Sequence, residues 1–155
     1  MLYPYILLIH SSLRWLVVLS LLATLVSAYS GLLQARAYKP VDQTIRIAAT
    51  SIVHTQFLVG FYLYIISPLI RYYWQTRPAF SEAPALSFFA LIHSGLMITA
   101  VIVMTIGSSK AKRQTDGRQR FKTTAIYFTA GLLLILLAIP WPFSPLADRP
   151  WIRTF

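Results

Sequence analysis

The sequence contains no cysteine and few charged side chains. Only 12% of its 155 residues are charged, and four of these are acidic. A soluble domain carries about 25% charged residues, so this chain has too little charge to cover a water-facing surface. The lack of cysteine excludes thiolate metal sites, iron–sulfur clusters, disulfide frameworks and covalent c-type haem attachment. A soluble globular enzyme and a disordered chain are both excluded.

The common catalytic motifs are also missing. The chain has no Walker-type loop, dinucleotide fingerprint, nucleophile elbow or HExxH segment. The four acids lie in expected loops, at Asp42, Glu82, Asp116 and Asp148. No pair of carboxylates is therefore expected within the apolar segments. This favours an electron-transfer protein over an enzyme with a substrate of its own.

What the chain has is apolar sequence in four long runs. Hydrophobic residues make up 57% of the chain, and the mean hydropathy is +0.62. A membrane-spanning helix needs about 20 mostly apolar residues. The runs cover residues of about 5–33, 45–67, 86–107 and 123–139. With short connections between them, they predict an all-α fold, an integral membrane four-helix up-down-up-down bundle forming one domain over 1–155.

The basic residues indicate an orientation. The net charge is +10 with fourteen Lys and Arg, and in membrane proteins such residues collect on cytoplasmic loops. Nine of them lie in or beside the first and third loops: Arg36, Lys39, Arg46, Lys110, Lys112, Arg113, Arg118, Arg120 and Lys122. We therefore expect both termini outside, in a bacterial inner (cytoplasmic) membrane. The third loop is interpreted as an anchor near anionic lipid, so no nucleic acid partner is expected.

All three histidines lie in predicted spans, where polar groups are costly and usually functional. His10 and His93 occupy the same place in a repeated motif, which reads LIHSSL in the first span and LIHSGL in the third. These two spans face each other across the diagonal of an antiparallel bundle, so the imidazoles should meet at one depth. The pair suits the two axial positions of haem b. Structural hydrogen bonding and a copper or zinc site remain alternatives.

His54 and Arg14 are further candidates for cofactor binding. His54 should lie roughly 8–10 Å deeper than the other two histidines, which leaves a second haem, a proton or quinone path, or a core hydrogen bond open. Arg14 follows His10 by one helical turn and keeps its charge. Its candidate partners are a haem propionate or other ligand, a lipid phosphate, or backbone carbonyls. Interhelical hydrogen bonds are expected from Gln56, Ser11, Ser94 and Thr99.

The chain resembles a family of small four-span bacterial membrane proteins labelled cytochrome b-like. The resemblance covers nearly the whole chain and rests on HSSLRW at 10–15, HTQ at 54–56, His93 with Met97, and the ending IPWPF at 139–143. More loosely, the arrangement is similar to one half of a haem A synthase bundle, in which two histidines on alternate helices bind haem.

This chain departs from the haem A synthase pattern in two places. The segment that corresponds to Gln-x-x-Leu-Gly is 56–60, which has Val59 in the leucine position, and the glutamate near the first histidine has no counterpart. The resemblance therefore implies haem binding by His10 and His93, and it gives no support to haem-modifying activity.

Together these features predict a membrane b-type cytochrome that transfers electrons. Its expected environment is the lipid bilayer, with quinol as a candidate donor, a redox protein as a candidate partner and a homo-oligomer as an open alternative. Two other classes of function remain. One is a non-catalytic membrane subunit or small transporter with structural histidines, and the other is a copper- or zinc-binding membrane protein.

Overall fold

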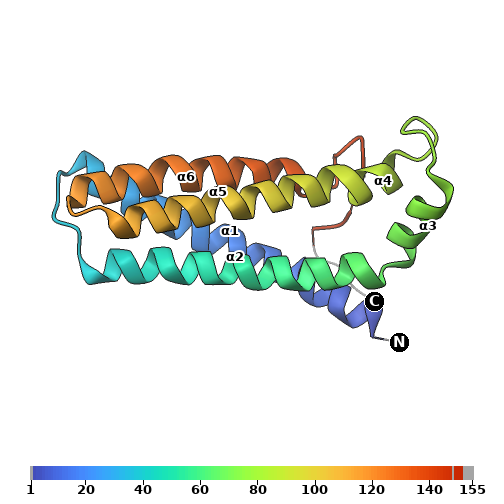
Figure 1. Ribbon diagram of the computed structural model, residues 1–155, viewed down its shortest axis with the longest axis horizontal. Helices are drawn as coiled ribbons and strands as arrows, with labels where there is room; N and C mark the ends of the chain where they lie inside the picture. Colours follow the sequence, from blue (N-terminus) through green and yellow to red (C-terminus); the bar gives the residue numbers. More distant parts are fainter. Residues whose placement is uncertain (1, 148, 152–155) are drawn as a thin grey trace.

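The computed structural model describes residues 2–147 and 149–151, so the predicted loop acid Asp148 lies outside the described residues. Its four long apolar helices are each suited to crossing a membrane. They are α1 (Tyr3–Leu33), α2 (Pro40–Ile66), a continuous helical segment Pro84–Arg113, and α6 (Gly117–Ala138). They run alternately up and down as one bundle, and the described residues contain no β-strand (Figure 1). The prediction of an all-α, multi-pass membrane bundle is confirmed.

The third span is not one regular helix. It begins with the short α4 (Pro84–Ser87), continues through a π-helical segment η1 (Phe88–His93), and ends as α5 (Ser94–Arg113). Outside the spans, α3 (Pro68–Thr76) forms in the second loop, where Pro68 starts the helix and the Ser67 hydroxyl accepts a hydrogen bond from Ile70 N–H. Neither η1 nor α3 is predicted by the sequence.

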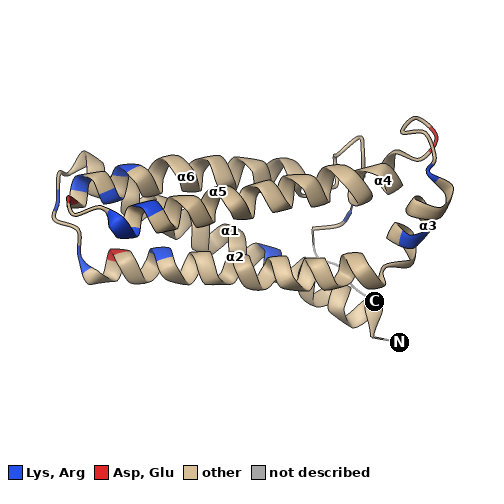
Figure 2. Cartoon of the chain, viewed as in Figure 1, with Lys and Arg blue, Asp and Glu red and all other residues tan. Residues whose placement is uncertain are grey.

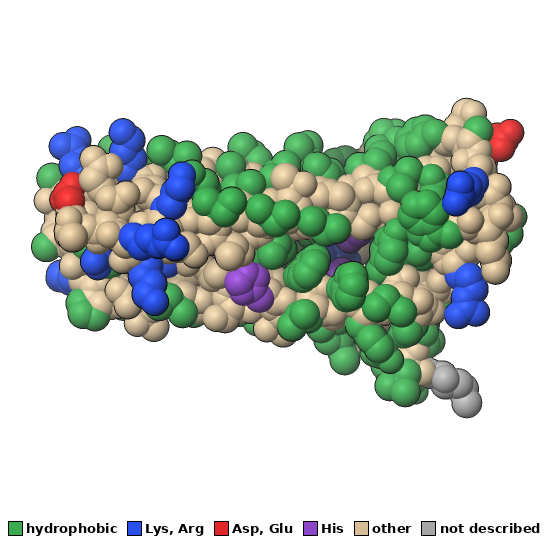
Figure 3. Space-filling view, in the orientation of Figure 1, with side chains coloured by type: hydrophobic (Ala, Val, Ile, Leu, Met, Phe, Trp, Pro, Cys, Tyr) green, Lys and Arg blue, Asp and Glu red, His purple; other side chains and the backbone are tan. Residues whose placement is uncertain are grey.

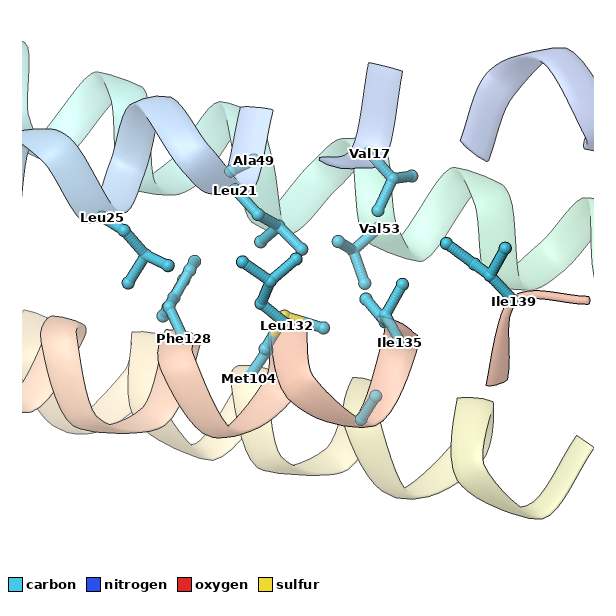
Figure 4. Packing of buried hydrophobic residues seen from close by; sticks show 11 residues of the cluster. Val17, Leu21, Leu25, Ala49, Val53, Met104, Phe128, Leu132, Ile135 and Ile139 are labelled. Atoms are coloured by element: carbon cyan, nitrogen blue, oxygen red, sulfur yellow. The ribbon is translucent and has the colours of Figure 1, made fainter. Parts of the chain in front are cut away.

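The helices surround a core of aliphatic and aromatic side chains. α1 packs on α2 and α6, and α5 packs on α6 and less extensively on α2, so α1 and α5 are diagonal as predicted. The central cluster draws side chains from every span, among them Leu21, Val53, Met104, Phe128 and Leu132 (Figure 4). This packing fixes the two diagonal helices relative to each other.

Glycines allow the closest helix contact, which is between α5 and α6. A Cβ atom on Gly107 would lie 2.2 Å from Cβ of Tyr127, and one on Gly131 would lie 2.4 Å from Cγ of Met104. Membrane helices commonly approach through such small residues, because close backbone packing replaces the missing hydrophobic driving force. Any larger residue at Gly107 requires the two helix backbones to separate.

The two ends of the bundle differ in charge. Lys and Arg gather at the end that carries the α1–α2 and α5–α6 loops, and α3 and the N-terminus lie at the opposite end (Figure 2). Within the basic end, Asp42 is not a loop residue as predicted, because Pro40 starts α2 two residues before it. Its side chain is 3% exposed and pairs with Arg36, with Oδ1 and Nη2 2.6 Å apart.

Arg46 is also buried, although the sequence places it at the edge of the first loop. It is 3% exposed and lies between α2 and α5, where Nη1 donates to the carbonyl oxygen of Ser108 at 2.8 Å. Its Nε has no hydrogen-bond partner within the described chain. Arg46 therefore ties α2 to α5 nearly two turns inside the basic end.

Candidate functional site

The structure brings His10 and His93 together between the first and third spans, in the half of the bundle opposite the basic end. His10 comes from α1 and His93 is the last residue of η1; their ring centroids lie 6.4 Å apart with the planes at 75°. The prediction that the two imidazoles meet across the diagonal is confirmed. Figure 3 shows a hollow in the face between α2 and α5, with histidine visible at its floor.

His93 is oriented by the C-terminal end of α6. Its Nδ1 lies 2.8 Å from the carbonyl oxygen of Ala138. A carbonyl can only accept, so Nδ1 carries the hydrogen and Nε2 keeps a free lone pair. Histidine ligands of metals are usually held in this way, with the second ring nitrogen donating to a carbonyl or carboxylate.

The Ala138 carbonyl is free because Pro140 ends α6. A residue before proline avoids helical geometry, and Ile139 is accordingly extended, with ψ of 128°. The last carbonyls of α6 then lack helical partners. Two side chains donate hydrogen bonds to these carbonyls. His93 Nδ1 donates to the carbonyl oxygen of Ala138, and Trp141 Nε1 donates to that of Leu136 at 2.8 Å. The sequence predicts that Pro140 ends the fourth span, but it does not predict that a carbonyl freed there orients His93.

The π-helical segment also bears on the position of His93. A π turn adds one residue to a helical turn and so changes the direction of every later side chain; such segments are frequent at functional sites. Here the segment ends at His93, and Phe88 and Phe89 lie with their ring centroids 6.0 Å from the imidazole. The two aromatic rings limit the ring positions open to His93.

His10 has unused hydrogen-bonding capacity. Its Nδ1 is buried and has no hydrogen-bond partner in the described chain, and the same is true of Gln56 Oε1. Gln56 Nε2 donates to the backbone carbonyl of His10 at 2.9 Å and lies only 3.5 Å from the ring Nε2. Buried polar atoms without partners are rare in native proteins. A purely structural role leaves this pattern at His10 unexplained.

Helix α2 is shaped around the His10 ring. Gly60 follows Gln56 by one turn, and a Cβ atom on Gly60 would lie 2.8 Å from His10 Cε1. That separation is shorter than real Cβ contacts. The glycine therefore makes the space that the imidazole occupies.

The variant Gly60→Ala should destabilise the protein, because the added methyl group displaces the His10 ring. Overpacking of this kind costs about 1–3 kcal/mol. Gly95→Ala is the matched control: a Cβ there meets nothing within 4 Å, and helix propensity should stabilise it by about 0.5–1 kcal/mol. Denaturant unfolding of the detergent-solubilised variants measures both. Equal stability of the two variants would show that the His10 ring has room to move.

Arg14 lies beside the histidine pair and bonds within its own helix. Its Nε donates to the carbonyl oxygen of Ser11 at 2.8 Å, and Nη2 donates to the Ser11 hydroxyl at 2.6 Å. Helical side chains lean toward the N-terminus, so the guanidinium returns to the depth of His10 and Ser11. The carbonyl alternative is thus present, while an anionic partner for Arg14 stays a prediction.

His54 is not part of the pair. Its Nε2 lies 2.8 Å from the Thr105 hydroxyl on α5, and that hydroxyl donates to the carbonyl of Val101 at 2.7 Å. The Thr105 oxygen must then accept, so Nε2 of His54 carries the hydrogen. This interhelical bond is one of the roles kept open for His54.

Interhelical hydrogen bonds are expected from four polar residues, and of these four Gln56 forms one. The prediction is wrong for Ser11, Ser94 and Thr99. Ser11 bonds with Arg14 of its own helix, and the hydroxyls of Ser94 and Thr99 donate to carbonyls one turn earlier, at Ala90 and Gly95. Serine and threonine can satisfy themselves in this way without a second helix.

The donor set favours one kind of metal group over another. Within the described chain, no three or more His, Cys, Asp or Glu side chains come together. A zinc site needs three or four protein ligands, whereas haem iron takes only its axial ligands from the protein. Two imidazoles therefore fit haem better than a bare ion.

Comparison with protein-family models, with curated proteins and with solved structures finds no match to this chain. A function for this chain is therefore inferred from the geometry of His10, His93 and the residues around them.

Proposed function

We propose that the protein is a membrane-embedded b-type cytochrome that binds haem b with His10 and His93 as axial ligands. The observation that carries the proposal is the two imidazoles with their ring centroids 6.4 Å apart, one of which has Nε2 free through the Ala138 contact. At this separation the two side chains would hold one haem group between them.

The surrounding residues have distinct roles in this proposal. The Ala138 carbonyl strengthens His93 as a ligand, because a second ring nitrogen that donates a hydrogen bond makes the imidazole more basic. Gln56 and Gly60 position His10, and Arg14 offers a permanent cation to a propionate at the depth of the pair. When bound, the haem supplies one-electron chemistry.

We further propose that electrons come from quinol and pass to a redox partner protein, in a bacterial inner membrane. The family resemblance to cytochrome b-like proteins supports this setting. For His54 the Thr105 hydrogen bond favours a structural role. The copper- or zinc-binding alternative is supported less, because it needs more ligands than the pair provides.

The absorption spectrum of protein purified from haem-replete cells tests the proposal. A Soret band with α and β bands that sharpen on reduction supports haem b, and a pyridine haemochrome assay gives the haem-to-protein ratio. Folded protein without haem, or with stoichiometric zinc or copper by elemental analysis, would overturn it.

The proposed orientation, with both termini outside, makes a separate prediction. Alkaline phosphatase fused after Trp141 should be active, since that residue follows the end of α6 opposite the basic end. The same enzyme inserted after Gln114, in the basic α5–α6 loop, should be inactive. Activity assays in whole cells with matched expression give the comparison. The opposite pattern would reverse the orientation and leave the haem proposal standing.

A further inference from the structure

A cavity lies at the basic end of the bundle, away from the histidine pair. It has a volume of about 500 Å³ and opens between the α1–α2 and α5–α6 loops. The residues that matter for its chemistry are Gly31, Arg36, Tyr38, Asp116, Arg118 and Arg120. Pockets for small ligands commonly measure about 300–1,000 Å³, so this one can hold a ligand headgroup.

Three guanidinium groups line the cavity against one carboxylate. Arg36 is neutralised by Asp42, whose hydrogen bonds raise the pKa of Arg36 above its usual value. The carboxylate of Asp116 accepts hydrogen bonds from the backbone N–H groups of Arg118 and Gln119, at 3.1 and 3.2 Å. The wall is therefore positive on balance, and its free cations are Arg118 and Arg120.

Arg120 is held ready for a ligand. Its Nε donates to the carbonyl oxygen of Gln114 at 2.7 Å, and the guanidinium lies 5.2 Å from the ring centroid of Tyr38. Its two terminal nitrogens make no hydrogen bond within residues 2–147 and 149–151, nor does the side chain of Arg118. A planar guanidinium with its position fixed suits the paired oxygens of a phosphate group.

The cavity lies where two of the membrane-suited helices end. Its lining residue Gly31 is two residues before the end of α1, and its lining residue Arg120 is three residues after the start of α6. Headgroup regions border the apolar core of a bilayer, so the cavity lies at the depth of phospholipid headgroups. A ligand with an anionic head at that depth and an apolar tail in the bilayer therefore matches the position of the cavity.

We propose that this cavity binds the phosphate headgroup of an acidic phospholipid through Arg118 and Arg120. Basic pockets between membrane helices are a recognised setting for such headgroups. The general attraction of a basic loop for anionic lipid needs no defined pocket. The proposed site is more specific, because only Arg118 and Arg120 bind the phosphate group and the basic residues nearby, such as Lys112 and Arg113, do not.

The test compares two variants with the same loss of charge. R118Q/R120Q removes the free cations of the cavity, and K112Q/R113Q removes two exposed cations from the end of α5 that do not line it. Phosphatidylglycerol is titrated into detergent-solubilised protein and bound lipid is counted by native mass spectrometry. Losing two charge-assisted hydrogen bonds should weaken binding about tenfold or more in R118Q/R120Q. K112Q/R113Q should remain within about twofold of wild type, since screened surface charges contribute little.

Further arms separate the sources of the signal. R118K/R120K keeps the charge but not the planar fork and should recover part of the affinity. Phosphatidylcholine, which has no net charge, should bind weakly to every form. Equal weakening in R118Q/R120Q and K112Q/R113Q would overturn the site. Glycerol phosphate binding as tightly as the lipid would overturn the lipid assignment. Melting curves verify that each variant is folded, and the haem spectrum should be the same in all of them.

Discussion

If His10 and His93 hold haem as proposed, alanine at either position should abolish the low-spin haem spectrum. Each change removes one of the two imidazoles whose centroids lie 6.4 Å apart. Loss of one axial ligand leaves five-coordinate, high-spin iron or no bound haem at all. The Soret position and the electron paramagnetic resonance spectrum of purified protein report the change. It is the largest expected effect, because low-spin haem requires both ligands.

His54→Ala is the matched control for this experiment. It removes the third imidazole but also a hydrogen bond to Thr105, so stability should fall by about 0.5–1.5 kcal/mol while the low-spin signal stays. Free imidazole added to His10→Ala or His93→Ala should restore part of that signal, which separates a ligand role from a folding defect. Loss of the signal in His54→Ala with retention in His10→Ala would show that the wrong pair is assigned.

Gly107→Leu should destabilise the bundle by about 3 kcal/mol or more. A Cβ atom at this position would lie 2.2 Å from Cβ of Tyr127, and a β-carbon can move only with its backbone. Overpacking usually costs about 1–3 kcal/mol, and more where backbones must shift. Steric trapping or denaturant unfolding in micelles measures the loss in free energy of unfolding.

Gly95→Leu is the comparison for Gly107→Leu, because Gly95 lies on the same helix with open space around its Cα. A leucine there should stabilise the protein by about 0.5–1 kcal/mol through helix propensity, as alanine does at the same position. Similar losses at the two positions would show that the α5–α6 contact is not limited by Gly107. The same result would imply that the two helices can separate at little cost.

The sequence predicts the spans well because membrane insertion depends on length and apolarity, and both are visible in the residues. It predicts the depth of His10 and His93 because the two repeats lie at similar distances from their span ends. It does not predict which face of each span is buried. Leu19 is 63% exposed and Leu21 is fully buried, yet both are leucine, because lipid and core are equally apolar.

The sequence does not predict the π turn, the burial of Arg46 or the partner of the Ala138 carbonyl, because all three depend on tertiary packing. Whether Phe88–His93 forms an α or a π turn depends on how the segment packs, and the same residues allow both. The burial of Arg46 depends on Ser108, sixty-two positions later in the chain. The Ala138 contact had a visible sign, since Pro140 predicts the end of α6 and hence free carbonyls, but the partner of those carbonyls is a matter of tertiary structure.

Two contacts near the end of α6 fix its register against the third span. Gly131 fixes α6 against Met104, and Ala138 fixes it against His93. These positions are seven residues apart (138 minus 131), or about two helical turns. A single residue inserted between them would turn the Ala138 carbonyl by about 100° and advance it by about 1.5 Å, away from the imidazole. The number of residues between Gly131 and Ala138 therefore determines where the Ala138 carbonyl meets His93, and through that hydrogen bond it determines the direction of the Nε2 lone pair.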